Sequence, residues 1–234
     1  MNSENNTCII CGEPVVHRHD SRELKCDLCG KTENAEYFCI DNHYVCNDCF
    51  ANPGAAVIRH VCLTTKSRNP LQIALMMMNS PAVFMHSADH HSIVAGALLA
   101  AYKNSGGEID LVPAVDEAIK RGSAVPYGVC ANTGTSGAAM SAGIFYSIVA
   151  KTNPFSVEEW GEGNLLVSRC LATIGKIGGP RCCKRCTYHA IETAVEYARE
   201  NLNVSMELPE KIKCSYVPKN PECIKQRCPY YPQK

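Results

Sequence analysis

The sequence lacks any run of about 20 apolar residues, the length that a helix needs to cross a bilayer. Its most apolar segments, 73–78, 92–102 and 136–150, are shorter, and glycine and serine interrupt the last two. The first residues carry neither a basic stretch nor an apolar one, so we find no secretory signal. We therefore expect a cytoplasmic protein without a membrane role.

The sequence also lacks net charge, because 23 Lys and Arg are balanced by 23 Asp and Glu. Without an excess of positive charge, a broad nucleic-acid surface is not expected. Neither a Walker A loop nor a G-x-G-x-x-G motif is present, and no internal repeat stands out. With 46% hydrophobic and 20% charged residues, 234 residues are enough to bury a core, which excludes wholesale disorder.

Cysteine, in contrast, is abundant: the chain has 16, most of them in close pairs. In a reducing compartment such clusters usually bind metal or perform redox chemistry. Eight cysteines fall within residues 1–62 and eight within 130–228. Turn and break signals at 52–54 and 67–70 lie between the two blocks. We therefore predict a zinc-binding module over residues 1–62 and a helical, Cys-rich domain over 63–234.

Apolar residues recur every three or four positions through most of the second block, which predicts a mainly α fold. The predicted helices are 71–79, 89–103, 111–121, 136–151, 156–176 and 187–201. Ser156 with Glu159 matches a capping box, and Gly178-Gly179-Pro180 matches a helix stop. Cys62 and Cys170 are predicted to pack in the core. From Cys214 onward the tail is predicted to be irregular and folded back on the helices.

Four ligand pairs follow one another in the first block, and three of them have the C-x2-C spacing of zinc knuckles. The run from Cys26 to Cys49 resembles the first six ligands of a RING finger, whose alternate pairs share an ion. This cross-braced pattern predicts two tetrahedral zinc sites, with Gly12 and Gly30 in the knuckle turns. The sets are Cys26, Cys29, Cys46 and Cys49 for one ion, and Cys8, Cys11, Cys39 and His43 for the other. With one zinc only, Cys39 and His43 would be spare. Eight ligands leave no open catalytic position, so a structural role is favoured.

Cys183 and Cys186 form a further C-x2-C directly before the helix predicted from Thr187, with Cys182 adjacent. A helix N-terminus stabilises anions, and Arg181, Lys184 and Arg185 add positive charge, so these thiols are predicted to ionise easily. They could form a redox pair, a cluster ligand pair or one more zinc knuckle.

The tail adds Cys214, Cys223 and Cys228, the last followed by proline. Joined to Cys183 and Cys186 they offer five thiolates, enough for an iron–sulfur cluster or a further zinc. The tail cysteines could close on their own chain or on a second subunit, which leaves a homo-oligomer open.

A glycine- and hydroxyl-rich loop, 127–137, contains Cys130 and leads into the helix predicted from Ser136. Such a loop can present backbone N–H groups to a carboxylate, phosphate or sulfur species, with Cys130 as nucleophile or ligand, or it can simply cap the helix. His86, His90 and His91 cluster before the preceding helix, and His90 or His91 is a candidate base or ligand.

Taken together, these motifs resemble an uncharacterised cysteine-rich domain family of unknown function. The resemblance implies proteins of anaerobic bacteria and methanogenic archaea, in which the domain stands alone or is fused to radical-SAM or methyltransferase modules. It rests on Cys39-x3-His43-Tyr-Val-Cys46-x2-Cys49, Met85-His86-x3-His90-His91, Gly128-Val-Cys130 with Gly134 and Gly137-Ala-Ala139, Gly178-Gly-Pro-Arg-Cys182-Cys183-Lys-Arg185 and Cys223-x4-Cys228-Pro229. The order of these motifs, but not their spacing, also faintly resembles that of iron–sulfur L-serine dehydratases and cysteine desulfidases.

Two hypotheses follow. The first is a lyase or sulfur-transfer enzyme that uses a reactive thiol or iron–sulfur centre on a small anionic or sulfur-containing substrate. In it Cys130, His90 and His91 are catalytic, and Cys182, Cys183, Cys186, Cys214, Cys223 and Cys228 supply a cluster or redox pair. The alternative is a non-catalytic, zinc-stabilised adaptor that docks a radical-SAM enzyme or a methyltransferase.

Overall fold

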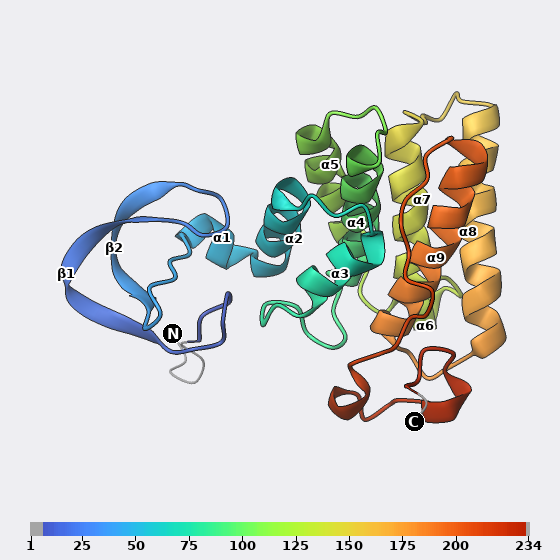
Figure 1. The fold of residues 1–234 in the computed structure, drawn as a ribbon. Coiled ribbons are helices and arrows are strands. Elements are labelled where there is room, and N and C mark those ends of the chain that lie inside the picture. The colour runs from blue at the N-terminus through green and yellow to red at the C-terminus, as the bar shows by residue number, and fades with distance from the viewer. Residues whose placement is uncertain (1–6, 233–234) are drawn as a thin grey trace.

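The computed structural model describes residues 7–232, and its N-terminal part is built on a two-stranded antiparallel ribbon (Figure 1). Strand β1 (Val15–Lys25) pairs with β2 (Thr32–Cys39), and the register is irregular between His17 and Arg22. A short helix, α1 (Asn47–Ala51), follows. The ribbon brings the start of β1 beside the end of β2, and its hairpin turn lies at the opposite end. The cysteine pairs of the first block are thereby divided between the two ends.

The remaining described residues are mainly helical, which confirms the predicted fold class. The helices are α2 (Pro53–Thr64), α3 (Pro70–Met78), α4 (His90–Asn104), α5 (Leu111–Ser123), α6 (Val129–Asn132), α7 (Gly137–Val149), α8 (Glu158–Ile177) and α9 (Cys183–Asn201). The tail after α9 has two short 3-10 turns, Val217–Lys219 and Lys225–Arg227, and is otherwise irregular. It runs back along the bundle to its lower end (Figure 1).

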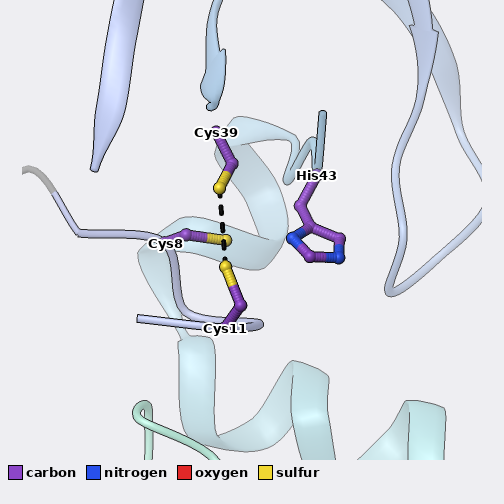
Figure 2. A group of neighbouring side chains, drawn as sticks. All are labelled: Cys8, Cys11, Cys39 and His43. Carbon is purple, nitrogen blue, oxygen red and sulfur yellow. Dashed lines mark hydrogen bonds between the residues drawn. The ribbon is translucent and has the colours of Figure 1, made fainter. Parts of the chain in front are cut away.

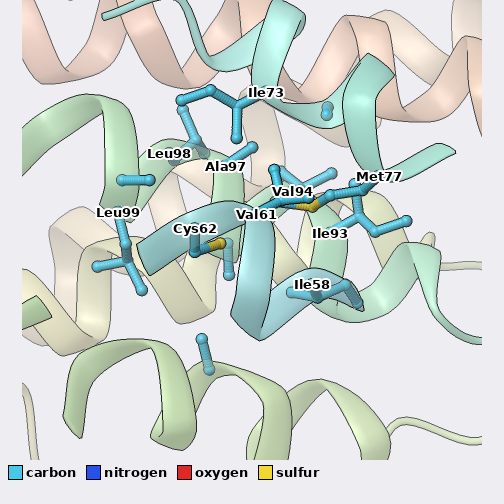
Figure 3. Close-up of a cluster of buried hydrophobic side chains, with 14 of the residues drawn as sticks. Ile58, Val61, Cys62, Ile73, Met77, Ile93, Val94, Ala97, Leu98 and Leu99 are labelled. Atoms are coloured by element: carbon cyan, nitrogen blue, oxygen red, sulfur yellow. The ribbon is translucent and has the colours of Figure 1, made fainter. Parts of the chain in front are cut away.

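Helix α4 is the centre of the bundle, and α2, α3, α5, α7 and α9 pack around it. All its residues from His90 to Tyr102 are buried, because many are alanine or glycine and let neighbouring helices approach closely. At Gly96 an added Cβ would lie 3.0 Å from the Cys62 sulfur and 3.1 Å from Ile58. Figure 3 shows these side chains packed with Val94 and Leu98. Cys62 and Cys170 are fully buried, as predicted.

Two local predictions at helix starts are wrong, and one helix was missed. Helix α9 begins at Cys183, with Cys182 as its N-cap, so the C-x2-C pair lies in its first turn and not before the helix. Ser156 does not cap α8: its Oγ accepts a hydrogen bond from the Asn153 N–H, and α8 begins two residues later. Helix α2 was not predicted, although Pro53 has the fixed φ that suits a first helical turn. This helix runs across residue 62, and the division of the chain into 1–62 and 63–234 stays a prediction.

Several helices of the bundle begin at the same end. An added Cβ at Gly137, the first residue of α7, would overlap the His91 ring in the first turn of α4. Ser136, the N-cap of α7, interacts with the Cys186 thiol in the first turn of α9. The N-termini of α4, α7 and α9 are therefore neighbours. Within residues 7–232 no helix combines the length and apolarity that spanning a bilayer requires.

Candidate metal centres and thiol site

The first group of candidate ligands, Cys8, Cys11, Cys39 and His43, lies at the open end of the ribbon (Figure 2). Their ligand atoms are all within 4.8 Å of one another, and the Sγ atoms of Cys11 and Cys39 are 3.5 Å apart. The His43 ring points a nitrogen toward the three sulfurs in Figure 2. Its Nδ1 is buried and has no hydrogen-bond partner among the described residues. A buried imidazole nitrogen without a partner is costly, and a metal ion would satisfy it.

The second group, Cys26, Cys29, Cys46 and Cys49, lies at the hairpin end and also fits within 4.8 Å. Burial opposes ionisation of Cys26, yet the backbone amides of Cys46, Cys29 and Leu28 outweigh it and lower the pKa of this thiol to about 7. Burial and the neighbouring Cys29 and Cys46 sulfurs raise the pKa of Cys49 above its ordinary value. Four thiolates cannot stay close together without a cation between them.

These two groups are the sets that alternate pairing predicted. The knuckle glycines have the left-handed conformation that their turns require, with φ of 88° at Gly12 and 78° at Gly30. The arrangement could hold two metal ions, each with four protein ligands. Full four-fold coordination leaves no position for a substrate, which is typical of structural sites.

The structure divides the C-terminal cysteines into two sets. Cys182, Cys214, Cys223 and Cys228 line one small cavity between the start of α9 and the tail. Cys183 and Cys186 do not line that cavity. Cys183 lies close enough to Cys130 for the two thiols to affect each other's charge. Adjacent residues 182 and 183 therefore differ in their surroundings, because Cys182 lines the cavity and Cys183 does not.

The predicted easy ionisation of these thiols is wrong. Burial raises the pKa of Cys182 and of Cys183, although the backbone amides of Arg185 and Ser87 act in the opposite direction. Burial also raises the pKa of Cys186, to about 11. The helix N-terminus is worth about 1 kcal/mol or less to an exposed anion, whereas an unpaired charge in an apolar surrounding costs more. Burial therefore outweighs the helix N-terminus, and these thiols ionise less readily than an exposed cysteine.

His90 and His91 occupy the first turn of α4 and differ in their partners. His90 Nδ1 lies 3.1 Å from the Ser87 carbonyl and His91 Nδ1 lies 3.1 Å from the Val125 carbonyl, so each donates from Nδ1 and keeps a lone pair on Nε2. His90 Nε2 is buried without a partner among the described residues. The Ser87 backbone connects His90 to Cys183, because its carbonyl accepts from His90 while its amide lowers the pKa of the thiol. Cys130 is exposed in α6 and lies near enough to Cys183 to affect its charge.

A family model describing a family of unknown function, DUF5714, matches residues 58–231. The match covers about three quarters of the chain, from within α2 to the last part of the tail. The chain belongs to the DUF5714 family. No curated protein and no solved structure shows a significant match. Both N-terminal ligand groups lie before residue 58, whereas the thiol site and the cavity cysteines lie inside the DUF5714 match.

Sequence reasoning missed Lys184, Ser87 and Ser136 as members of this DUF5714 site. Lys184 was counted only as positive charge near a helix start, yet it is 1% exposed and its Nζ lies 3.5 Å from the Phe84 carbonyl. Ser136 is 4% exposed at the start of α7. The adjacency of Lys184 to two cysteines was a usable signal for Lys184. Nothing local to Ser87 or Ser136 predicts their long-range partners.

The DUF5714 domain should lose stability in mild acid because of His90. Burial, reinforced by Lys184, lowers the pKa of His90 to about 3, whereas an unfolded histidine titrates near 6.5. The stability associated with neutral, buried His90 is therefore fully present above pH ~6.5 and is lost as the pH falls toward about 3. From pH 7 to pH 5 the free energy of unfolding should fall by about 2 kcal/mol through this group. The measurement is urea unfolding of wild type and His90→Gln at both pH values.

The His90→Gln chain should show a smaller fall, because it has no imidazole to protonate at this position. His19→Gln is the matched control, since His19 is exposed on β1 and should leave the wild-type pH dependence unchanged. Equal pH dependence in wild type and His90→Gln would contradict the prediction. Protonation of thiolates at the two candidate metal centres would be common to all three chains.

Proposed function

We propose that this protein binds two structural zinc ions and uses its helical domain for thiol chemistry on a small anionic or sulfur-containing ligand. The observation that carries the proposal is His90, whose buried Nε2 has no partner within residues 7–232 and whose Nδ1 is linked through the Ser87 backbone to Cys183, a thiol near enough to the exposed Cys130 to be affected by its charge. A neutral imidazole with an available lone pair can take or return a proton. The two thiols supply the nucleophile or sulfur acceptor.

The surroundings favour an anionic ligand. The N-termini of α4, α7 and α9 meet here, and neither α4 nor α7 has a side-chain cap on its first turn. Lys184 adds a buried ammonium group close to His90. Helix N-termini and a buried cation together favour negative charge. A carboxylate or a persulfide therefore fits the site better than a neutral ligand.

The zinc ions have a separate role. Thiolate and imidazole ligands in sets of four are the usual structural zinc environment, and zinc needs no redox partner. A two-stranded ribbon is only marginally stable by itself, so the ions would supply most of the folding free energy of the N-terminal module. Chemistry on a substrate is accordingly assigned to the helical domain.

Selective alkylation tests the proposed function. An ordinary thiolate reacts more slowly with the anion iodoacetate than with neutral iodoacetamide, because like charges repel. In the native chain we expect the iodoacetate-to-iodoacetamide rate ratio at Cys130 to rise several-fold above its value in the urea-unfolded chain, as followed by peptide mass spectrometry. His90→Gln should slow alkylation and change its pH profile, whereas the exposed control His19→Gln should not. An equal ratio in native and unfolded chains would refute the anion site.

A docking role is the second candidate, favoured by an exposed apolar surface at the start of α8. Phe155 is 92% exposed, Val157 82%, and Trp160 and Leu165 are more than half exposed. Large apolar side chains gathered within 11 residues are typical of protein-binding surfaces. A radical-SAM enzyme or methyltransferase is the partner that the family resemblance suggests. Failure of the alkylation test with both zinc sites intact would favour this role.

A further inference from the structure

The cavity below α9 brings together four cysteines that are far apart in the sequence. Cys182 is the N-cap of α9, whereas Cys214, Cys223 and Cys228 belong to the irregular tail. All four line the same small cavity, and Tyr188, Tyr216 and Tyr230 complete much of its wall. We infer that Cys182, Cys214, Cys223 and Cys228 ligate a third metal centre, independent of the thiol chemistry proposed at Cys130.

The loops around these sulfurs repeat a feature of the N-terminal ligand groups. In the first N-terminal group, backbone N–H groups two residues further on donate to Cys8 and Cys39 at 3.4 Å. In the tail, the N–H groups of Tyr216 and Lys225 donate in the same way to Cys214 and Cys223, both at 3.4 Å. Amide donors aimed at sulfur stabilise the thiolate that a metal requires. The tail therefore presents its cysteines in the form of ligand loops.

Cys182 has comparable support from two different directions. The Arg185 N–H donates to its sulfur at 3.5 Å, and the Asn220 side-chain amide approaches it at 3.6 Å. Asn220 is itself buried, and it belongs to the tail segment between Cys214 and Cys223. Two N–H donors aimed at one buried sulfur would stabilise the thiolate that this residue becomes once it ligates a metal.

Two buried cations next to the cavity supply the charge balance for such a centre. Lys184 is 1% and Arg185 5% exposed, and among residues 7–232 neither has a carboxylate within 4.0 Å. Arg185 lines the cavity, and the Lys184 ammonium lies over the Tyr216 ring at 4.8 Å. Buried charges are normally paired. Four thiolates around a divalent ion, or around a cluster of charge +2, carry a net charge of −2, which these two side chains would neutralise.

The spacing of the sulfurs bears on the kind of centre. Among the described residues, only the two N-terminal groups bring their ligand atoms within 4.8 Å of one another. Zn–S bonds of about 2.3 Å imply sulfurs about 3.8 Å apart in a tetrahedral site. The sulfurs of the tail set are therefore more widely spaced than those of a single-ion site. This spacing favours an iron–sulfur cluster, because its inorganic core holds the ligating cysteines further apart than a single ion does. Both centres use the same soft thiolate ligands.

The test compares metal content in the full chain purified without oxygen. Zinc, iron and acid-labile sulfide are measured per chain in wild type, Cys223→Ser and the control Cys130→Ser, whose exposed thiol lies outside the cavity. We expect Cys223→Ser to lose one metal centre that both other chains keep. Lost iron with sulfide would identify a cluster, and a lost third zinc would identify a single ion. Wild-type metal and sulfide content in Cys223→Ser would overturn the inference.

A second measurement uses only the wild-type chain, so its result does not depend on whether a variant folds correctly in the tail. Iodoacetamide is applied to the native wild-type chain before and after the metal is removed by a chelator, or by mild oxidation where iron is present. Cys214, Cys223 and Cys228 should be protected at first and should react many-fold faster after metal removal. Equal labelling of the three cysteines before and after treatment would also overturn the inference.

Discussion

Replacing His43 with alanine should cost the protein one metal ion and destabilise the two-stranded ribbon of its N-terminal module while the helical bundle stays folded. His43 supplies the one nitrogen ligand of the first group, and its buried Nδ1 has no other partner among the described residues. Zinc binding contributes about 10–16 kcal/mol to small zinc domains. After dialysis against a chelator, wild type should keep both N-terminal ions and His43→Ala only one. Hydrogen exchange read by mass spectrometry should show lost protection in β1 and β2.

His19→Ala is the matched control for this experiment, because His19 lies exposed on β1 and outside both ligand groups. It should keep both ions and wild-type protection. The bundle should remain protected in both variants, since α3, α5, α7 and α9 pack around α4 and lie outside the module. If His43→Ala retains two N-terminal ions after dialysis, the first group is not a metal site.

The ligand groups of the module could be predicted because their information is local. A C-x2-C pair fixes two sulfurs within one turn, and the order of four pairs leaves few ways to combine them. Periodicity likewise predicted α3, α4, α5 and α7 to within two residues at each end. In these segments the sequence pattern and the tertiary environment favour the same structure.

The C-terminal site could not be predicted in the same way, since it depends on the path of the tail. Cys182 lines one cavity with Cys214, Cys223 and Cys228, which are 32 to 46 residues away, whereas its neighbour Cys183 does not line that cavity. No spacing rule separates two adjacent cysteines. The pKa prediction was wrong for a related reason: the positive end of a helix is visible in the sequence, but burial of the thiol is not. Burial has the larger effect.

Replacing Gly122 with alanine should lower the free energy of unfolding by about 1–3 kcal/mol, the usual cost of overpacking a core. Gly122 lies near the end of α5, where an added Cβ would lie 2.7 Å from the His91 carbonyl oxygen and 2.9 Å from its carbonyl carbon. These are backbone atoms of α4, so no side-chain rotation relieves the clash. The gain from replacing a helical glycine, about 1 kcal/mol at most, does not offset it. Urea unfolding followed by circular dichroism measures the change.

Gly175→Ala is the control, because Gly175 is also helical but has open space where the Cβ would be placed. It should raise the free energy of unfolding by up to about 1 kcal/mol. The clash at Gly122 falls on His91, so the same variant should also move that imidazole away from the start of α7 and slow alkylation at the thiol site. A Gly122→Ala chain as stable as Gly175→Ala would mean that α4 and α5 pack less closely than the structure shows. The contact that positions His91 would then be too loose to support a role for it in proton transfer.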